Sequence, residues 1–77
     1  MNRERRKKLM QLSEKLSEVR TSLENILEEE EDAFDNMPES IQETERGEQM
    51  QEYIEAMEEA ISNIEEIESN LEEIYNV

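Results

Sequence analysis

Apolar residues recur along the first half of the chain at alternating spacings of three and four residues. The series is Leu9, Leu12, Leu16, Val19, Leu23 and Ile26, and it continues through Glu30 to Ala33 and Met37. Such a heptad seam is typical of a helix that packs lengthwise against another helix. The pattern therefore predicts one long helix from about Arg3 to Asp35.

A second series with the same spacing occupies the second half of the chain. Its members are Met50, Ile54, Met57, Ile61, Ile64, Leu71 and Tyr75, with Glu68 in the gap before Leu71. By the same argument this series predicts a second long helix, from about residue 44 to residue 75. The chain then forms a single all-helical domain over residues 1–77.

The two helices are expected to be joined by a link over residues 36–44. Pro38 lacks an N–H group and disfavours helical conformation in the residue before it, so the first helix must end near this point. Two signals for the restart compete, because Ser40 and Glu43 have the spacing of a capping box while Thr44 is itself a suitable N-cap. We expect a short helical turn between the break and the second long helix.

Charge supports an antiparallel hairpin. Residues 1–20 carry seven basic and three acidic side chains, whereas residues 21–77 carry one basic and twenty acidic ones. Basic residues at a helix start and acidic residues at a helix end oppose the helix dipole, so each helix alone is unfavourable. Antiparallel pairing would place the basic residues 3–8 beside the acids near the end of the chain. Those acids are Glu65, Glu66, Glu68, Glu72 and Glu73.

The apolar faces are wider than one partner helix can cover. Residues beside the two seams are also apolar: Leu27 and Phe34 in the first helix, and Tyr53, Ala60, Ile67 and Ile74 in the second. A face that uses three of seven heptad positions belongs to a bundle. We therefore expect a coiled-coil-like hairpin that associates into a homo-oligomeric helix bundle, most simply a dimer. Glu30 and Glu68 would then be splayed to solvent at the bundle ends or placed around a cavity.

The composition argues against enzymes, cofactors and metal sites. The net charge is −15, and the chain has no Cys, His or Trp, so a thiol nucleophile, the usual neutral-pH acid/base and the commonest metal ligands are missing. The acidic run over residues 28–32 lacks the Gly-centred pattern of a calcium loop and suits a solvated helix surface. The N-terminus lacks the apolar region of a signal peptide and no stretch suits a bilayer, so we expect a cytoplasmic location.

Arg46 is the most informative charged residue, because it is the only basic side chain after residue 20. It could simply pair with Glu43, Glu45 or Glu48. Alternatively, an arginine beside helix-terminal N–H groups can bind a phosphate or carboxylate. In an oligomer, further residues near the link could join it. The candidate ligand-binding residues are Arg46, Arg20, Tyr53, Asn36, Gln42 and Gly47.

Gly47 lies in the first turns of the second helix, where glycine lowers helix propensity but allows a close backbone approach. Other residues are candidates for contact with a protein partner, either as part of the acidic run or as adaptable methionines that flank the link. They are Glu28, Glu29, Glu31, Asp32, Met37 and Met50.

Three segments resemble small acidic two-helix proteins of phages, prophages and integrative elements of Gram-positive and gut bacteria. They are DNMPESIQ (residues 35–42), ERGEQM (residues 45–50) and EEAISNIEE (residues 58–66). Small accessory phage proteins of this size often look like counter-defence factors. The resemblance thus implies a binding protein that blocks or sequesters a component of host immunity, in the cytoplasm of an infected or lysogenic bacterium.

Three functions remain open. The acidic surface could mimic nucleic acid and compete for a nucleic-acid-binding groove of a host defence protein. Arg46 could instead help an oligomer to act as a sponge for a small anionic nucleotide signal. The chain could also be a structural coiled-coil adaptor. Direct binding to nucleic acid or to a membrane is not expected, because a net charge of −15 opposes it.

Overall fold

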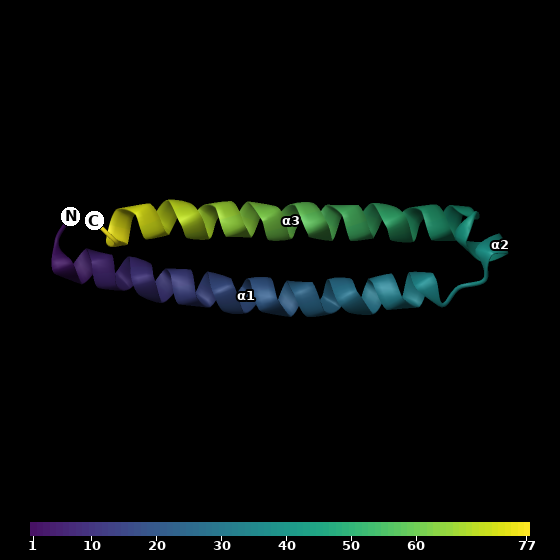
Figure 1. Cartoon of the computed structure of the whole chain (residues 1–77), viewed down its shortest axis with the longest axis horizontal. Coiled ribbons are helices and arrows are strands. Elements are labelled where there is room, and N and C mark those ends of the chain that lie inside the picture. Colours follow the sequence, from purple (N-terminus) through teal and green to yellow (C-terminus); the bar gives the residue numbers. More distant parts are fainter.

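The protein is a helical hairpin in the computed structural model, which describes all of residues 1–77 (Figure 1). Helix α1 covers Arg3–Asp35, the short α2 covers Glu39–Gln42, and α3 covers Glu45–Tyr75. The hairpin is a rod of 58 × 15 × 13 Å, with both chain ends at the end opposite α2. The all-helical fold is thereby confirmed.

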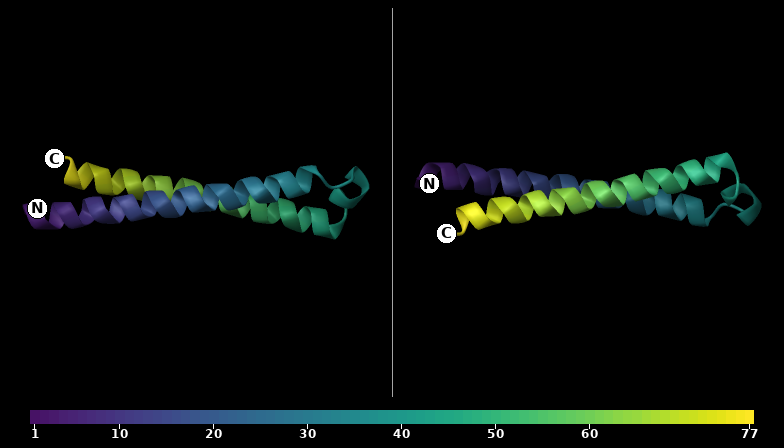
Figure 2. Two further views of the ribbon diagram at one scale, coloured as in Figure 1. Left: turned by 90° about the horizontal axis from the view of Figure 1, so that it is seen from below. Right: turned by 90° about the horizontal axis from the view of Figure 1, so that it is seen from above.

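The two long helices pack side by side and cross at a shallow angle along their length (Figure 2). This arrangement is the usual one when a heptad seam on each helix meets the other. No helix has an apolar stretch of the length that crossing a membrane requires.

Side-chain hydrogen bonds fix the helix ends, in part differently from the expectation. The Asn2 side chain accepts a bond of 2.8 Å from the Arg5 N–H and so caps α1. Thr44 occupies the N-cap position of α3, but its hydroxyl donates to the Ile41 carbonyl and accepts from no helix N–H. Ser40 lies within α2, so it forms no capping box for α3.

The link is held by Gln42 and Gly47. The Gln42 side-chain amide donates to the carbonyl oxygens of Phe34, at 2.9 Å, and Met37, at 3.1 Å, near the end of α1. Gly47 is buried against the backbone of Gln42. A Cβ atom at Gly47 would lie 2.5 Å from the Gln42 carbonyl carbon and closer still to its oxygen. The close backbone approach expected at this glycine is therefore confirmed, and no other residue fits without moving the link.

The seam of α1 differs from the predicted one in four of the nine predicted members. The half-buried residues that face α3 are Arg6, Leu9, Ser13, Leu16, Arg20, Leu23, Leu27, Glu30, Phe34 and Met37. The predicted members Leu12, Val19, Ile26 and Ala33 are exposed. The stripe that faces α3 in their place is mixed, because only two of its five members are apolar: Arg6, Ser13, Arg20, Leu27 and Phe34. This rotation partly buries Leu27 and Phe34 and brings Arg20 to Glu68, the one acidic residue in the seam of α3.

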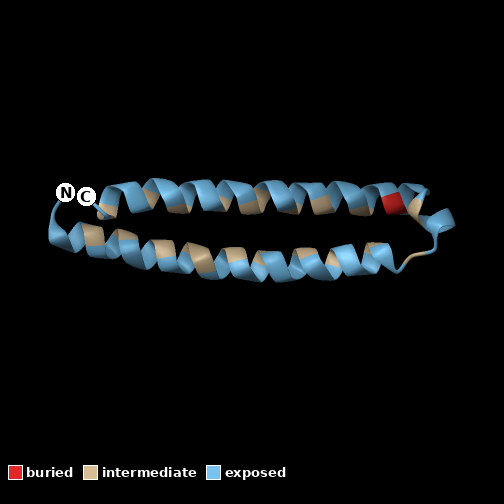
Figure 3. Ribbon diagram, viewed as in Figure 1, coloured by how far each residue is buried: buried red, intermediate tan, exposed pale blue.

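The seam of α3 is the predicted one. Its members are Gly47, Met50, Ile54, Met57, Ile61, Ile64, Glu68, Leu71 and Tyr75. Gly47 is the single fully buried residue of the chain, and every hydrophobic side chain keeps some contact with solvent (Figure 3). One hairpin thus makes a line of contact between two helices and encloses no core.

The basic residues at the start of α1 lie at the same end of the rod as the acidic end of α3, yet they form no ion pair with them. The Nε atom of Arg6 is shielded from solvent and has no hydrogen-bond partner. Exposed pairs between long side chains gain little from a fixed geometry. The expected neighbourhood is present, but the one ion pair between the two long helices is that of Arg20 with Glu68.

Candidate functional site

One long side of the hairpin is apolar. We call it the apolar side. On each long helix it consists of one residue in every seven, and each of these residues directly precedes a residue of the seam. Its members are Leu12, Val19, Ile26 and Ala33 on α1, and Tyr53, Ala60, Ile67 and Ile74 on α3. The six large side chains among them are between 41% and 55% exposed. Such a continuous apolar stripe on a small protein marks an interaction surface.

Both stripes lie on the same side of the hairpin. A shallow hollow there is lined by Glu30 from α1 and by Tyr53, Met57 and Ala60 from α3. On α1, Glu30 lies one helical turn after Ile26. Val19 and Ile26, together with Leu23, line another hollow on this side. The apolar positions of α1 and α3 therefore form one surface along the rod.

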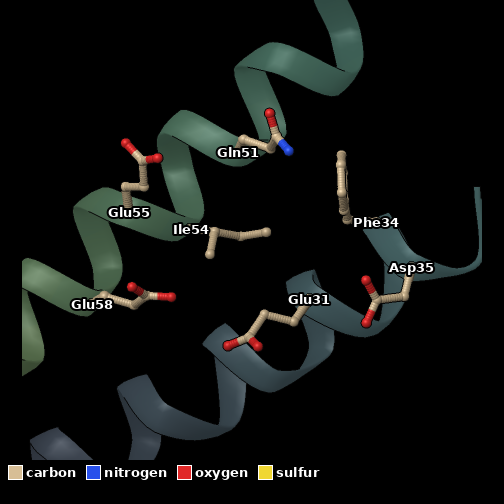
Figure 4. Close-up of a pocket in the computed structure, with 7 residues that line it drawn as sticks. All are labelled: Glu31, Phe34, Asp35, Gln51, Ile54, Glu55 and Glu58. Carbon is tan, nitrogen blue, oxygen red and sulfur yellow. The ribbon is translucent and has the colours of Figure 1, made fainter. Parts of the chain in front are cut away.

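The opposite side is acidic, and near the link it contains a third hollow, of about 400 Å³ (Figure 4). The aromatic ring of Phe34 and the side chain of Ile54 point into this hollow from the two helices. Four carboxylates and one amide surround these two apolar side chains. They belong to Glu31, Asp35, Glu55, Glu58 and Gln51. We call this group the acidic hollow.

Arg20 is bound within the protein. Its Nε donates to Glu68 at 2.7 Å, one terminal nitrogen donates to Glu24 at 2.9 Å, and the other reaches the Ser17 hydroxyl at 3.4 Å. The hydrogen bond to Glu68 is the main reason that the pKa of Arg20 is raised above its ordinary value. The sequence predicts Glu68 to be splayed to solvent or placed around a cavity, and this prediction is wrong. Glu68 pairs with Arg20 across the two helices.

Arg46 forms no ion pair in the hairpin. It lies exposed beside Glu45, Glu48, Gln49 and Glu52 at the surface of α3. The partner of Arg20, Glu68, is 22 residues further along α3, which corresponds to about 33 Å of helix. One hairpin therefore does not bring the two arginines into a common site.

The other candidate ligand residues are also dispersed. Tyr53 lies on the apolar side, Asn36 is exposed at the end of α1, and the side chain of Gln42 is already hydrogen-bonded to the backbone. Gly47 is covered by that same backbone. Within one hairpin, a shared anion site of these residues with Arg46 is not formed.

Of the candidates for protein contact, Glu31 lines the acidic hollow. Glu28, Glu29 and Asp32 are exposed elsewhere on α1. Met37 and Met50 are half-buried near the link, so only part of each side chain is open to a partner.

Sequence reasoning missed most of the acidic hollow. Asp35, Gln51, Glu55 and Glu58 were not singled out, although they fall beside the seam residues Phe34 and Ile54. In α3, Glu58, Glu65 and Glu72 repeat every seven residues beside the seam. This regular spacing could have predicted an acidic side of the hairpin from the sequence. No group of three acidic residues is arranged to hold a metal ion.

Comparisons with known proteins add no further constraint. No protein-family model matches the chain, and neither a curated protein nor a solved structure does. The resemblance to phage-encoded two-helix proteins therefore stays a prediction, and the functional argument depends on the two sides of the hairpin described above.

Proposed function

We propose that this chain is a homo-oligomeric, non-enzymatic binding protein that uses its acidic side to cover a cationic surface of another protein. The observation that carries the proposal is the separation of charge and apolar surface onto opposite sides of one rod. The acidic side then remains available to a partner while copies of the chain associate elsewhere. The cationic surface that fits best is a groove that normally binds nucleic acid.

The acidic hollow supports this proposal in detail. A lysine or arginine side chain of a partner would lay its aliphatic stem against Phe34 and Ile54 and direct its charged end to the surrounding carboxylates. The ring of Phe34 adds a favourable interaction with a cation that lies over its face. The hollow thus combines apolar contact with charge pairing, which a uniformly acidic surface does not offer.

Long-range electrostatics act in the same direction. Residues 21–62, which include the link, carry fifteen acidic side chains and one basic side chain, a net charge of −14. Concentrated charge of one sign accelerates encounter with a surface of the opposite sign, and the effect weakens as salt rises. The link half of the rod is therefore the part that should first meet a cationic partner.

The homo-oligomeric part of the proposal is supported by the incomplete burial in one hairpin. All large side chains of the apolar side stay about half exposed, and no hydrophobic side chain is fully buried. A chain of 77 residues gains little stability from a single line of contact between two helices. Association through the apolar side would complete a core of four or more helices.

We place this activity in the cytoplasm of an infected or lysogenic bacterium, where the partner is a host defence protein that binds nucleic acid. A sponge for a nucleotide signal has less support. Arg46 is surrounded by Glu45, Glu48 and Glu52, which repel an anion, and Arg20 is engaged by two carboxylates. A structural adaptor remains compatible with the apolar side alone.

Binding can be tested with a fluorescent ten-residue oligoarginine peptide titrated by anisotropy. The variant Glu31→Gln/Glu58→Gln removes two charges from the acidic hollow, and Glu66→Gln/Glu73→Gln removes two from an exposed stripe of α3. We expect affinity to fall about fivefold more for the first variant, because contacts with charged groups in a hollow exceed those on an open surface. Equal losses of affinity in the two variants would show that only net charge matters. An affinity for oligoarginine that does not change as the salt concentration rises would contradict the proposal.

The biological role can be tested in bacterial strains that each carry one nuclease-based defence system. Production of the wild-type chain should restore phage plaques in at least one strain, and Glu31→Lys/Glu58→Lys should abolish that effect. Glu66→Lys/Glu73→Lys is the matched control and should retain most of it. If wild type restores no plaques in any strain while binding oligoarginine as above, the counter-defence role is wrong and the binding property stands.

A further inference from the structure

The two stripes of the apolar side share one midpoint along the rod. The stripe on α1 runs from Leu12 to Ala33, and the one on α3 runs from Tyr53 to Ile74, so each spans 22 residues. The midpoints fall between residues 22 and 23 and between residues 63 and 64. Because Arg20 contacts Glu68 across the helices, these two midpoints lie within about one helical turn of the same level.

Equal stripes with a common midpoint are what a two-fold axis requires. If a second hairpin lies face to face and antiparallel on the apolar side, Val19 meets Ile26 of the other copy and Leu12 meets Ala33. On α3 the corresponding pairs are Tyr53 with Ile74 and Ala60 with Ile67. Each large side chain is matched with another apolar one, and the stripes themselves contain no charged residue, although Glu30 lies beside them in the hollow with Tyr53 and Ala60.

The positions that flank the stripe on α1 fit the same axis. They are Lys8, Lys15, Ser22 and Glu29, and the corresponding positions on α3 are the uncharged Gln49, Ala56, Asn63 and Asn70. Lys15 and Glu29 are each seven residues from Ser22. In an antiparallel pair centred near Ser22, Lys15 therefore faces Glu29 of the other copy, and this opposite-charge contact occurs twice. All three residues are exposed in the single hairpin.

Charge also decides between the two possible orientations. The half of the rod with the chain ends, residues 1–20 and 63–77, carries seven basic and eight acidic side chains and has a net charge of −1. The link half, residues 21–62, has a net charge of −14. Hairpins with their links at the same end would bring the two strongly acidic halves together. Hairpins with links at opposite ends place each acidic half against a nearly neutral one.

We infer that a second copy of this chain packs antiparallel on the apolar side, with α1 against α1 and α3 against α3, about a two-fold axis beside Ser22. This inference rests on the homo-oligomeric association proposed above and specifies its surface, orientation and register. A side 58 Å long and 15 Å wide offers on the order of 800 Å² per partner, which is the contribution of each subunit to a standard-size interface. The product is a four-helix bundle.

Charge reversal tests the register. Lys15→Glu or Glu29→Lys alone creates two like-charge contacts across the axis, so each should raise the dimer dissociation constant about tenfold. The double variant Lys15→Glu/Glu29→Lys should return to within about threefold of wild type because both contacts are restored with reversed sign. Lys7→Glu, which makes the same charge change away from the apolar side, is the control and should stay near wild type. Sedimentation equilibrium measures all four.

Cross-linking tests the position of the axis. The chain has no cysteine, so Ser22→Cys introduces a single thiol, and two such thiols meet near the axis. A short bis-maleimide should couple most Ser22→Cys chains into a covalent pair of twice the 9.2 kDa chain mass. The control Ser62→Cys, on the outer surface of α3, should stay mostly uncoupled.

Each outcome separates this geometry from the broader proposal. A stable dimer without rescue by the double variant and without Ser22→Cys coupling would overturn the geometry and leave the homo-oligomer. A wild-type chain of monomer mass at micromolar concentration would overturn both and would leave the apolar side to another protein. Oligoarginine binding is measured independently, so its loss would overturn the function of the acidic side and not this inference.

Discussion

The apolar and acidic sides are built from the same two helices, yet they present opposite chemistry. On one side, the heptad positions next to the seam carry only apolar residues, and on the other side, most of the equivalent positions carry Glu: Glu24, Glu31, Glu58, Glu65 and Glu72. A net charge of −15 describes neither side. The difference shows that the position of a residue within the heptad, more than the overall composition, decides which surface of this hairpin suits which partner.

The strongest way to break this difference is to place a charge on the apolar side. Ile26→Glu should raise the dissociation constant of the proposed dimer by about 100-fold, because its two-fold symmetry would bury two unpaired carboxylates for each pair of chains. Asn25→Glu adds the same charge one residue away, outside the apolar side, and should change the constant less than threefold. Sedimentation equilibrium compares the two variants. Equal effects would mean that the two sides do not differ in the way described.

A smaller effect is expected at Gly47, where α3 lies against the backbone of the link. Alanine normally stabilises a helix relative to glycine, but in Gly47→Ala the added Cβ overlaps the Gln42 backbone. We expect the free energy of unfolding to fall by about 2 kcal/mol, as for other overpacked sites. Ser62→Ala, at an exposed position of the same helix, should raise it by about 0.5 kcal/mol. Urea denaturation followed by circular dichroism measures both, and a stabilised Gly47→Ala variant would contradict the close approach.

The smallest effect is expected for the ion pair between Arg20 and Glu68, which lies in the seam between the apolar and acidic sides. Arg20→Leu leaves Glu68 without its partner in the seam and should lower the melting temperature by a few degrees. Arg20→Leu/Glu68→Leu replaces the pair by apolar contact and should melt at or above the wild-type temperature. Thermal melts by circular dichroism give the order. If the double variant were the least stable of the three, the ion pair itself would be a main source of stability.

The sequence predicts the limits of the helices and the seam of α3 well, because their signals are local. Pro38 ends α1, and the series from Met50 to Tyr75 has seven apolar members, against four in the stripe from Tyr53 to Ile74 beside it. The rotation of α1 is different. Leu12 and Leu27 are equally suitable for burial, and an arginine such as Arg20 is rarely expected within a seam. Only the packing of both helices decides between them.

The candidate site was predictable in part, for a similar reason. The rarity of basic residues after the N-terminal segment drew attention to Arg46 and Arg20, but rarity does not specify position in space. Their separation along the rod follows from the pairing of Arg20 with Glu68. The acidic hollow depends on residues from both helices, for example Glu31 and Glu58, and it emerges only when the register between the helices is known.

The acidic hollow lies close to the link, and this off-centre position has a consequence for the proposed dimer. The two-fold axis would place one hollow toward each end of the rod, with an offset along the rod of roughly 30 Å by the rise of α3 between Ile54 and the midpoint of its stripe. Because the apolar sides meet each other, the two hollows would open on opposite faces of the bundle. One dimer would therefore hold two separate target molecules, one on each face, and would not bind a single target surface through both hollows.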